Sequence, residues 1–474
     1  MEGGVAALLQ LDRKRSQGYL YQQIYQQIKQ AILERQYKPH DRLPSKRELA
    51  TTLRISLNSV NAAYQQLVAE GYLYTRERLG FFVEELDSFY VKPKNQDSDI
   101  PPHLLEVQKT EGLKKYFSHM SADIHMFPLE KWLSCEEQAL KKKKKLLEEY
   151  IDPQGVYSVR QTIARFLSQS RGVRCYPEQI VLGSGTQLLT RQLTKLLPKD
   201  TIYGLEEPGY QRMYQLLKSE DRSITSLEID WKGIRIDALQ ASMANVLFTT
   251  PSHQFPTGAI MPISRRIQLL NWANSAPDRY IVEDDYDSEY KYDADSIPSL
   301  QGMDGASRVI YMGSFSKSLL PGLRMSYMVL PIPLLEMYRR SLHFLMSSCS
   351  TITQLTLQAF IETGEYQKHI KKTTKLYRIR RAMLIDKLLD KFGDCISVEG
   401  EKSGLHFLVS FDIDRTEEQI KRQAEEKGLL LYGISRFYNQ SVPPRKPTLI
   451  LGFANMRTTD MDEAVGLLWE AVFN

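Results

Sequence analysis

The chain has 474 residues, of which 42% are hydrophobic and 25% are charged, and its formal net charge is +5. This length is too great for one ordinary hydrophobic core, so we expect two or more domains, one of them large. No apolar stretch approaches the roughly 20 residues that a membrane helix needs, which argues against a membrane protein. Because the net charge is mild, any nucleic-acid binding must come from a local basic patch.

The N-terminus and the cysteines predict a cytoplasmic protein. The first ten residues include a short apolar stretch but neither a basic start nor a clear cleavage site, so we expect no signal peptide. The four cysteines are widely scattered and form neither C-x-x-C pairs nor a disulfide framework. They are typical of free thiols in a reducing compartment.

Residues 17–85 have the pattern of a small helical unit. Apolar residues recur at helical spacing between Tyr21 and Ile32, which predicts a helix that ends near residues 37–39. Ser45 and Glu48 are spaced as a capping box, which predicts the start of a second helix. After a short turn, Ser56 can cap a third helix.

The third predicted helix has a buried face made by Val60, Ala63, Tyr64 and Leu67, and Gly71 can end it. Residues 72–83 then alternate around a glycine turn and predict a two-stranded wing. Three short helices with a tight turn between the last two, followed by a wing, indicate a winged helix-turn-helix.

Polar and basic side chains predicted to be exposed on this unit could bind duplex DNA. Amide and hydroxyl groups on the third helix suit base edges and phosphates, whereas the basic residues suit the DNA backbone. The alternatives are a solvated polar surface and a protein-interaction module. The candidate DNA-binding residues are Lys46, Arg47, Ser56, Asn58, Ser59, Asn61, Arg76 and Arg78.

The motifs of this unit resemble the GntR family of bacterial winged-helix repressors. The resemblance is carried by L-P-S-K-R-E-L-A from residue 43, S-L-N-S-V-N from residue 56 and G-F-F-V from residue 80. That family commonly has arginines in and just before the third helix, where this chain has Leu57 and Asn61. The DNA bases that the family recognises therefore cannot be inferred for this chain from the resemblance.

Residues 86–115 are polar and proline-containing with little periodicity, and we interpret them as a linker. Some thirty flexible residues have a root-mean-square reach of roughly 30 Å. The run of five lysines at residues 141–145 is typical of a solvated helix face, and DNA-backbone contact is the alternative.

From residue 116 to 474, strand-like and helical stretches alternate, which predicts an α/β domain with a largely parallel sheet. Strands are predicted at residues 179–182, 201–205, 245–250, 279–283 and 308–312. Each ends in polar or glycine residues. Ligands of open α/β sheets bind beyond the carboxyl ends of the strands, so these clusters should converge on one site.

Lys317 follows the last of these strands in a serine-rich turn, with Arg324 seven residues later. A lysine amine can form an aldimine with an aldehyde cofactor when its neutral form is accessible. A partly desolvated turn with a cationic neighbour lowers the lysine pKa in that direction. With nearby hydroxyl and guanidinium donors for a phosphate, the pattern predicts pyridoxal phosphate as cofactor. A surface lysine after a strand is the alternative.

Other strand exits carry groups that suit the same cofactor. A glycine turn follows residue 182, Tyr210 offers a stacking ring, and an acidic run at residues 283–287 follows a buried strand. A carboxylate in that run can pair with a protonated pyridine nitrogen, and a tyrosine hydroxyl can bond the ring's phenolic oxygen. Metal binding or plain solvation is the alternative for the acidic run.

Together with Y-x-x-P-Q-G-x-Y from residue 150, these motifs resemble fold-type I aminotransferases across residues 116–474. The resemblance implies that Lys317 forms the internal aldimine and that Asp284, Tyr286 and Tyr210 contact the cofactor ring. The phosphate-binding residues that it implies are Ser184, Gly185, Thr186, Ser314, Ser316 and Arg324.

Two further positions bear on the ligand of this domain. Arg436 lies in the segment where such enzymes carry the arginine that grips a substrate carboxylate, and Arg212 follows Tyr210 on the same predicted strand exit. The family's usual N-P-T-G is Phe255-Pro-Thr-Gly258 here, so the asparagine that bonds the cofactor oxygen is missing.

A GntR-like unit joined to an aminotransferase-like domain resembles the MocR/GabR-type bacterial regulators nearly end to end. The resemblance implies a regulator that binds promoter DNA, forms a head-to-tail homodimer and senses γ-aminobutyrate or a related amino acid through an external aldimine. It also implies activation of amine-catabolism genes and repression of its own gene, with RNA polymerase as a further candidate partner. The alternatives are a working aminotransferase with an accessory DNA-binding domain and a regulator that binds pyridoxal phosphate alone.

Overall fold

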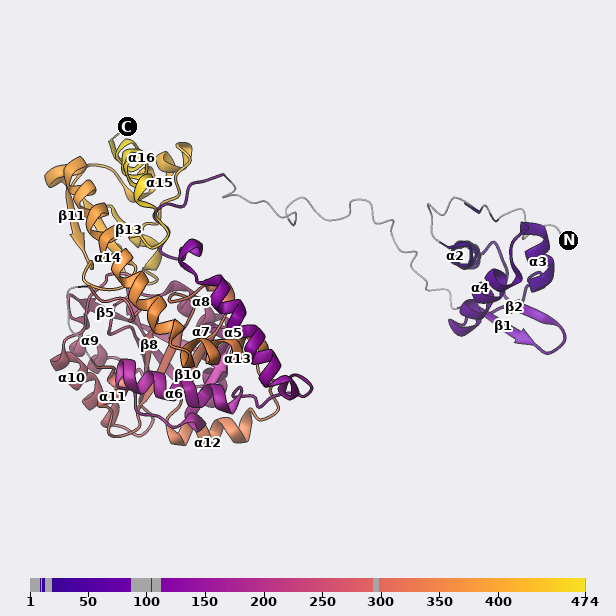
Figure 1. Cartoon of the computed structure of the whole chain (residues 1–474), viewed down its shortest axis with the longest axis horizontal. Coiled ribbons are helices and arrows are strands. Elements are labelled where there is room, and N and C mark those ends of the chain that lie inside the picture. Colours follow the sequence, from indigo (N-terminus) through magenta and orange to yellow (C-terminus); the bar gives the residue numbers. More distant parts are fainter. Residues whose placement is uncertain are drawn as a thin grey trace. The chain divides into compact units, whose positions relative to one another are not determined.

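The computed structural model describes residues 9, 11–12, 19–86, 104, 112–292 and 298–473. The chain divides into two compact units, residues 1–107 and 108–474 (Figure 1). The predicted linker falls mostly on residues 87–103 and 105–111, which lie outside the described residues, as do most of the first ten residues and residues 17 and 18.

The N-terminal unit contains the predicted winged helix-turn-helix. Its helices are α2 (Leu20–Leu33), α3 (Lys46–Leu53) and α4 (Leu57–Ala69), and strands β1 (Leu73–Arg76) and β2 (Gly80–Val83) pair antiparallel as the wing. The predicted capping box is present, because Ser45 Oγ accepts from the backbone of Glu48. Ser56 Oγ likewise accepts from the backbone of Ser59 and begins α4.

A single apolar core holds these elements together. Ile24 and Ile28 of α2 pack with Leu49 of α3 and with the predicted buried face of α4, and all are fully or almost fully buried. Tyr64 reaches out of this core to donate a hydrogen bond from its hydroxyl to the carbonyl of Pro44 at 3.0 Å. Helical periodicity identified the parts of this core that α2 and α4 contribute.

The second unit is built on an eight-stranded sheet with the order β3-β10-β9-β8-β7-β4-β5-β6. The five strands β4, β5, β7, β8 and β9 run parallel, and β10 pairs antiparallel with both β3 and β9. All five predicted strands are present. The strands are β3 (Ile180–Gly183), β4 (Ile202–Glu207), β5 (Ser223–Asp230), β6 (Gly233–Ile234), β7 (Val246–Thr249), β8 (Tyr280–Asp285), β9 (Val309–Ser314) and β10 (Ser326–Val329).

Helices pack around this sheet as in other α/β domains (Figure 1). Two separate apolar clusters join helices to the sheet. One contains residues of α7 and the other contains residues of α10. The helices are α5 (Leu129–Lys142), α6 (Tyr157–Arg171), α7 (Thr186–Leu196), α8 (Gln211–Ser219), α9 (Ile236–Ala241), α10 (Ile263–Asn274), α11 (Leu300–Met303), α12 (Ile332–Ser341) and α13 (Thr351–Glu362).

A second, three-stranded antiparallel sheet was not predicted. It contains β11 (Ile396–Glu399), β12 (His406–Phe411) and β13 (Thr448–Gly452), and it packs with α14 (Glu365–Phe392), α15 (Glu417–Glu426) and α16 (Met461–Phe473). Its strands are only four to six residues long, and runs this short do not separate a strand from a helix segment by periodicity. No described helix is long and apolar enough to cross a membrane.

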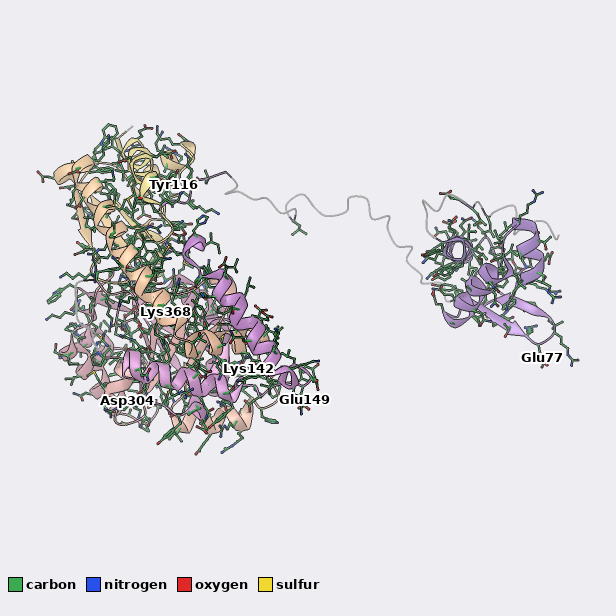
Figure 2. All side chains as sticks on the ribbon, viewed as in Figure 1. Glu77, Tyr116, Lys142, Glu149, Asp304 and Lys368 are labelled. Carbon is green, nitrogen blue, oxygen red and sulfur yellow. The ribbon has the colours of Figure 1, made fainter. Side chains whose placement is uncertain are left out.

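The lysine run at residues 141–145 spans the end of α5 and the following turn. Lys142 projects from the surface (Figure 2), and Lys141 pairs with Glu137 on the same helix at 2.5 Å. Lys143 turns inward and donates to Ser158 and Gln358. The run is therefore partly structural and partly solvated.

Candidate functional site

The strand exits converge on one pocket, as predicted. Residues that follow β3, β4, β7, β8 and β9 all contribute side chains or backbone to it. The lining residues are Met120, Gly185, Thr186, Gln187, Tyr210, Arg212, Thr250, Phe255, Asp284, Tyr286, Ser314, Ser316, Lys317, Pro321, Arg324, Ser326 and His406.

Lys317 reaches into this pocket from the turn after β9. Burial lowers the pKa of Lys317 to about 8, and the nearby carboxylate of Asp287 opposes that shift. The predicted direction and the predicted desolvation are confirmed, but no cationic neighbour among the described residues contributes to the shift. The ammonium donates to the backbone carbonyl of His119, a contact that holds the amine in place.

One end of the pocket has the donors that a phosphate needs. Gly185 precedes α7 with φ +120°, and a Cβ there would lie 2.3 Å from Nη2 of Arg324, so only glycine admits the guanidinium. Thr186 begins α7, which has no side-chain cap, and the backbone N–H groups of a helix start can bind an anion. Ser314 and Ser316 line the same pocket, and Ser314 Oγ accepts from the backbone of Ser316 at 3.1 Å.

Ser184 is the one predicted phosphate residue that does not line the pocket. Its backbone N–H donates to Ser348 Oγ at 3.1 Å, and its carbonyl accepts from Arg324 at 3.1 Å. Ser184 therefore positions the anchoring arginine in this structure.

The groups for an aromatic ring lie nearer to β8. Oδ1 of Asp284 is buried and has no hydrogen-bond partner among the described residues. Burial, reinforced by the carboxylates of Asp285 and Asp287, raises the pKa of Asp284 to about 7. An unpartnered buried carboxyl oxygen fits the protonated nitrogen of a pyridine ring, and Tyr210 and Tyr286 line the same space. These residues fit pyridoxal phosphate.

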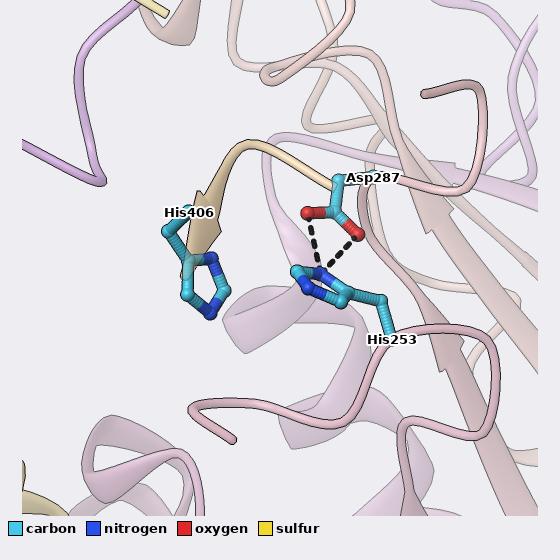
Figure 3. Close-up of side chains that lie close together, drawn as sticks. All are labelled: His253, Asp287 and His406. Atoms are coloured by element: carbon cyan, nitrogen blue, oxygen red, sulfur yellow. Dashed lines mark hydrogen bonds and ion pairs between the residues drawn. The ribbon is translucent and has the colours of Figure 1, made fainter. Parts of the chain in front are cut away.

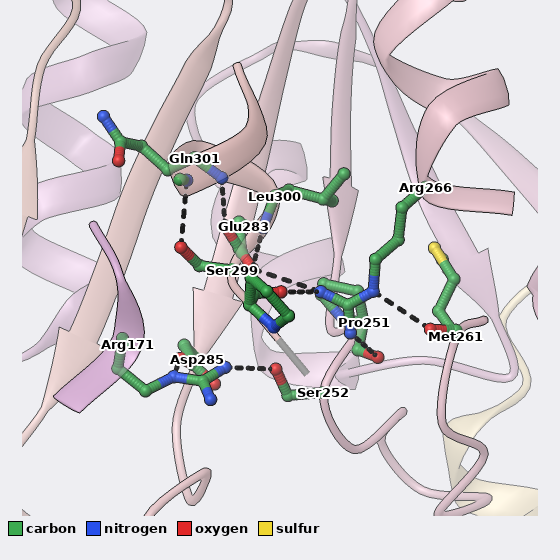
Figure 4. A network of polar contacts seen from close by, with 12 residues as sticks. Arg171, Pro251, Ser252, Met261, Arg266, Glu283, Asp285, Ser299, Leu300 and Gln301 are labelled. Carbon is green, nitrogen blue, oxygen red and sulfur yellow. Dashed lines mark hydrogen bonds and ion pairs between the residues drawn. The ribbon is translucent and has the colours of Figure 1, made fainter. Parts of the chain in front are cut away.

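A network behind the pocket holds β8 in position (Figure 4). Arg171 Nε binds Asp285 Oδ2 at 2.7 Å, with side chains only 6% and 1% exposed. Glu283 accepts from the backbone of Leu300 and of Gln301 at 2.9 and 3.0 Å, while Arg266 lies 4.0 Å from it. Of the four carboxylates in the acidic run, Glu283 and Asp285 are structural, Asp287 pairs with His253, and Asp284 faces the pocket.

The two arginines proposed for a ligand carboxylate are placed differently. Arg212 lines the pocket, from the first turn of α8 and not from the strand exit itself. Arg436 is exposed and does not line the pocket, and its guanidinium lies over the rings of Tyr432 and Phe437. Both arginines oppose protonation of the buried His119, whose pKa falls to about 3 chiefly through burial. Both arginines therefore lie close enough to His119 to act on it electrostatically.

Three buried residues beside the pocket could be considered as metal ligands, namely His253, Asp287 and His406 (Figure 3). However, His253 Nδ1 already bonds Asp287, and His406 Nε2 bonds the carbonyl of Pro256 at 3.1 Å. Since one nitrogen of each ring is in use, this cluster is better described as a hydrogen-bond network.

On the N-terminal unit, Arg47, Asn58, Asn61, Arg76 and Arg78 are exposed, as a DNA-binding surface requires. Ser56 is exposed as well, and several of the candidates, Arg76 among them, also make contacts within the unit. Lys46 donates to Asn61 Oδ1 at 2.6 Å and lies over the ring of Phe81. The hydroxyls of Ser56 and Ser59 bond each other at 2.9 Å.

Several pocket residues were missed from the sequence. His406 comes from β12 and Met120 from the segment before α5, both far from the strand exits in the chain. No local motif marks them. Thr250, Gln187 and Phe255 lie within the strand exits and motifs that the sequence marks, so strand-exit reasoning could have assigned them to the site.

Family models match both units. Residues 115–468 match aminotransferase class I and II, and residues 20–83 match bacterial regulatory proteins of the gntR family. Among solved structures, the multiple substrate aminotransferase from Thermococcus profundus has a TM-score of 0.68 at 23% identity, covering 78% of this chain and 96% of that one. At that identity the likeness shows the fold alone.

Curated relatives extend over nearly the whole chain. The HTH-type transcriptional regulators YhdI and YdeL of Bacillus subtilis are 37% and 38% identical, and the alignments cover 94% of this chain and 94% and 95% of theirs. The probable rhizopine catabolism regulatory protein MocR of Rhizobium meliloti is 29% identical over 95% of this chain and 93% of its own. The chain therefore belongs to the MocR/GabR-type transcriptional regulators, in which a GntR-family DNA-binding winged helix is joined to an aminotransferase-like domain that binds pyridoxal phosphate.

Proposed function

We propose that this regulator senses γ-aminobutyrate or a related ω-amino acid at the pyridoxal phosphate pocket. The supporting observation is that Arg212 lines the same pocket as Lys317, while Arg324 lies beside Gly185, where we expect the cofactor phosphate. An ω-amino acid carries its carboxylate several atoms from its amine, so it needs a cation away from the lysine. Arg212, with Arg436 as a second candidate, meets that need by a charge-assisted bond.

Pyridoxal phosphate, when bound, supplies an aldehyde that reacts reversibly with amines. The low pKa of Lys317 keeps part of the amine neutral near pH 8 and therefore nucleophilic. The Asp284 carboxylate would be the charge partner of the ring nitrogen, and the Tyr286 hydroxyl would donate to the phenolic oxygen of the ring. Exchange of Lys317 for a ligand amine would change the contacts at the sheet edge and shift the population of regulator conformations.

The organisation that we propose is a winged helix at residues 17–85, a linker at 86–115 and a sensor domain at 116–474. In a head-to-tail homodimer, such a linker would let the winged helix lie over the partner subunit. The regulator would then activate amine-catabolism genes, with RNA polymerase as a further partner, and repress its own gene. Reciprocal coupling requires that the ligand change DNA affinity and that DNA change ligand affinity by the same factor.

A titration of visible absorbance with two amines tests the ligand. γ-Aminobutyrate and butylamine share an amine, but only the first has a carboxylate. Arg212→Ala should lower the affinity for γ-aminobutyrate by about 30-fold or more, which is the effect of removing one partner of a desolvated charge pair. The affinity for butylamine should remain nearly unchanged. Arg191→Ala is a matched control, because that arginine lies on α7 and pairs with Glu220. Equal losses for both amines would contradict carboxylate capture by Arg212.

A working aminotransferase is the second candidate, and the intact set of Lys317, Asp284 and Tyr286 favours it. The phenylalanine at position 255 counts against it, since the amide donor of the enzyme family is missing there. Steady formation of a keto product from an amine and an acceptor keto acid, at a rate above that of Lys317→Ala, would support this candidate over a pure sensor.

A further inference from the structure

Beside Tyr286 lies a histidine–aspartate pair to which neither the fold nor the ligand pocket assigns a role. His253 follows β7, Asp287 follows β8, and their side chains are only 1% and 2% exposed. Nδ1 of His253 lies 3.2 and 3.0 Å from the two carboxylate oxygens of Asp287 (Figure 3). The same nitrogen lies 3.0 Å from the hydroxyl oxygen of Tyr286.

The backbone keeps this pair closed to other groups. Gly404 has φ +72°, and a Cβ at this position would lie 2.1 Å from His253 Nδ1 and 2.6 Å from Asp287 Oδ2. Any larger residue would collide with both members of the pair. On the other side, the ring of His406 lies 4.7 Å from that of His253, centroid to centroid.

The hydrogen-bond network determines which nitrogen of His253 carries the proton. An ionised carboxylate only accepts, so Nδ1 must donate to Asp287. Nε2 of His253 is buried and has no hydrogen-bond partner among the described residues. An unprotonated Nε2 at that position is less costly than a buried N–H donor without an acceptor, so the neutral ring with its proton on Nδ1 fits best.

This tautomer has a consequence for Tyr286. If Nδ1 were bare, the Tyr286 hydroxyl would donate to it, and its proton would point away from the pocket. With the proton on Nδ1, that nitrogen cannot accept from the hydroxyl, so the phenolic proton is left for the pocket that Tyr286 lines. Burial, together with Asp287 and Asp284, raises the pKa of Tyr286 well above its usual range, so the phenol keeps its proton.

We propose that His253 and Asp287 are positioning residues that turn the Tyr286 hydroxyl into a donor facing the ring oxygen of pyridoxal phosphate. The proposal rests on the role given above to Tyr286. It also accounts for how the site works with Phe255 at the position where the enzyme family has an asparagine. Phe255 packs edge-on against Tyr286 and offers no donor. The hydrogen bond to the ring oxygen therefore depends more strongly on how the Tyr286 hydroxyl is oriented.

The proposal predicts that the effect of the pair passes through Tyr286. The affinity of apoprotein for pyridoxal phosphate, measured by equilibrium dialysis and by visible absorbance, would be compared for Tyr286→Phe, His253→Leu and the double variant. Loss of one neutral hydrogen bond should weaken each single variant by about 10-fold. The double variant should be no weaker than Tyr286→Phe, because residues that act as one unit are not additive.

Rescue and folding controls complete the design. His253→Gln retains a donor, so its affinity for pyridoxal phosphate should lie within about 3-fold of that of the wild type. That difference corresponds to a fraction of the free energy of one hydrogen bond. Should His253→Leu fail to fold by its thermal melt, Asp287→Leu tests the same link with His253 in place. If Tyr286→Phe binds the cofactor normally, the role of Tyr286 itself is wrong. If Tyr286→Phe is weak but the pair variants bind normally, or if the losses multiply in the double variant, the positioning role is overturned.

Discussion

The buried pair of Arg171 and Asp285 allows a quantitative prediction about the support of the cofactor site. Arg171 ends α6, donates from Nε to Asp285 at 2.7 Å and from Nη2 to Ser252 Oγ at 2.7 Å. Arg171→Met keeps the apolar stem but leaves the Asp285 carboxylate buried with only hydroxyl partners, Tyr311 and Ser288, and no cation. Removing one partner of such a pair costs about 3–5 kcal/mol in the free energy of unfolding.

The pH dependence of that loss has a definite sign. Burial opposes ionisation of Asp285, but the charge of Arg171 and the hydrogen bonds from Tyr311 and Arg171 outweigh it and hold the pKa of Asp285 below its usual value. Its contribution to stability is therefore present above the unfolded pKa of about 3.9 and is lost as pH falls through the folded pKa. In Arg171→Met the uncompensated burial should raise that pKa. The difference in stability between the two proteins should therefore be large above the raised pKa of the variant and shrink as pH falls from there to the folded pKa of the wild type.

Denaturant unfolding followed by tryptophan fluorescence measures this difference. The four tryptophans, at positions 132, 231, 272 and 469, lie in the unit of residues 108–474, so the signal reports that unit alone. Arg235→Met is the matched control, because its guanidinium is 44% exposed, and it should cost at most about 1 kcal/mol. A loss below about 1 kcal/mol for Arg171→Met, or one that does not change with pH, would refute the reasoning built on its burial.

Three other predictions concern the two units. Lys317→Ala should abolish the borohydride-reducible link to pyridoxal phosphate yet leave DNA binding largely intact, and a link retained in the variant would assign the cofactor to another lysine. Asp284→Ala should weaken cofactor binding by about 10-fold or more in dialysis, the scale of a charge-assisted bond, whereas unchanged affinity would contradict its pairing with the ring nitrogen. Arg47→Ala should weaken binding to all duplex sequences and lower the salt slope by about one unit in a filter-binding series, whereas Asn61→Ala should relax sequence preference; the reverse pattern would exchange their roles.

Local patterns were enough to predict the N-terminal unit and five strands that lead to the pocket, but not β5, β6 and β10 of the same sheet. Helical periodicity and the Ser45 cap specify the N-terminal unit, because capping and one-sided burial depend on residues three or four apart. The buried strands of the large sheet appear as short apolar runs, and the polar residues after them indicate the ligand edge. Lys317 could be singled out because its turn carries several phosphate donors within a few positions.

Tertiary structure alone decided how similar residues divide their roles. Asp284 and Asp285 are neighbours in the chain, but alternation along β8 sends one toward the pocket and the other toward Arg171. His406 reaches the pocket from an antiparallel sheet that no local pattern predicted, and Ser184 turned out to support Arg324 instead of lining the cavity. These contacts join residues dozens to hundreds of positions apart, and their geometry depends on packing between elements, about which periodicity and short motifs carry no information.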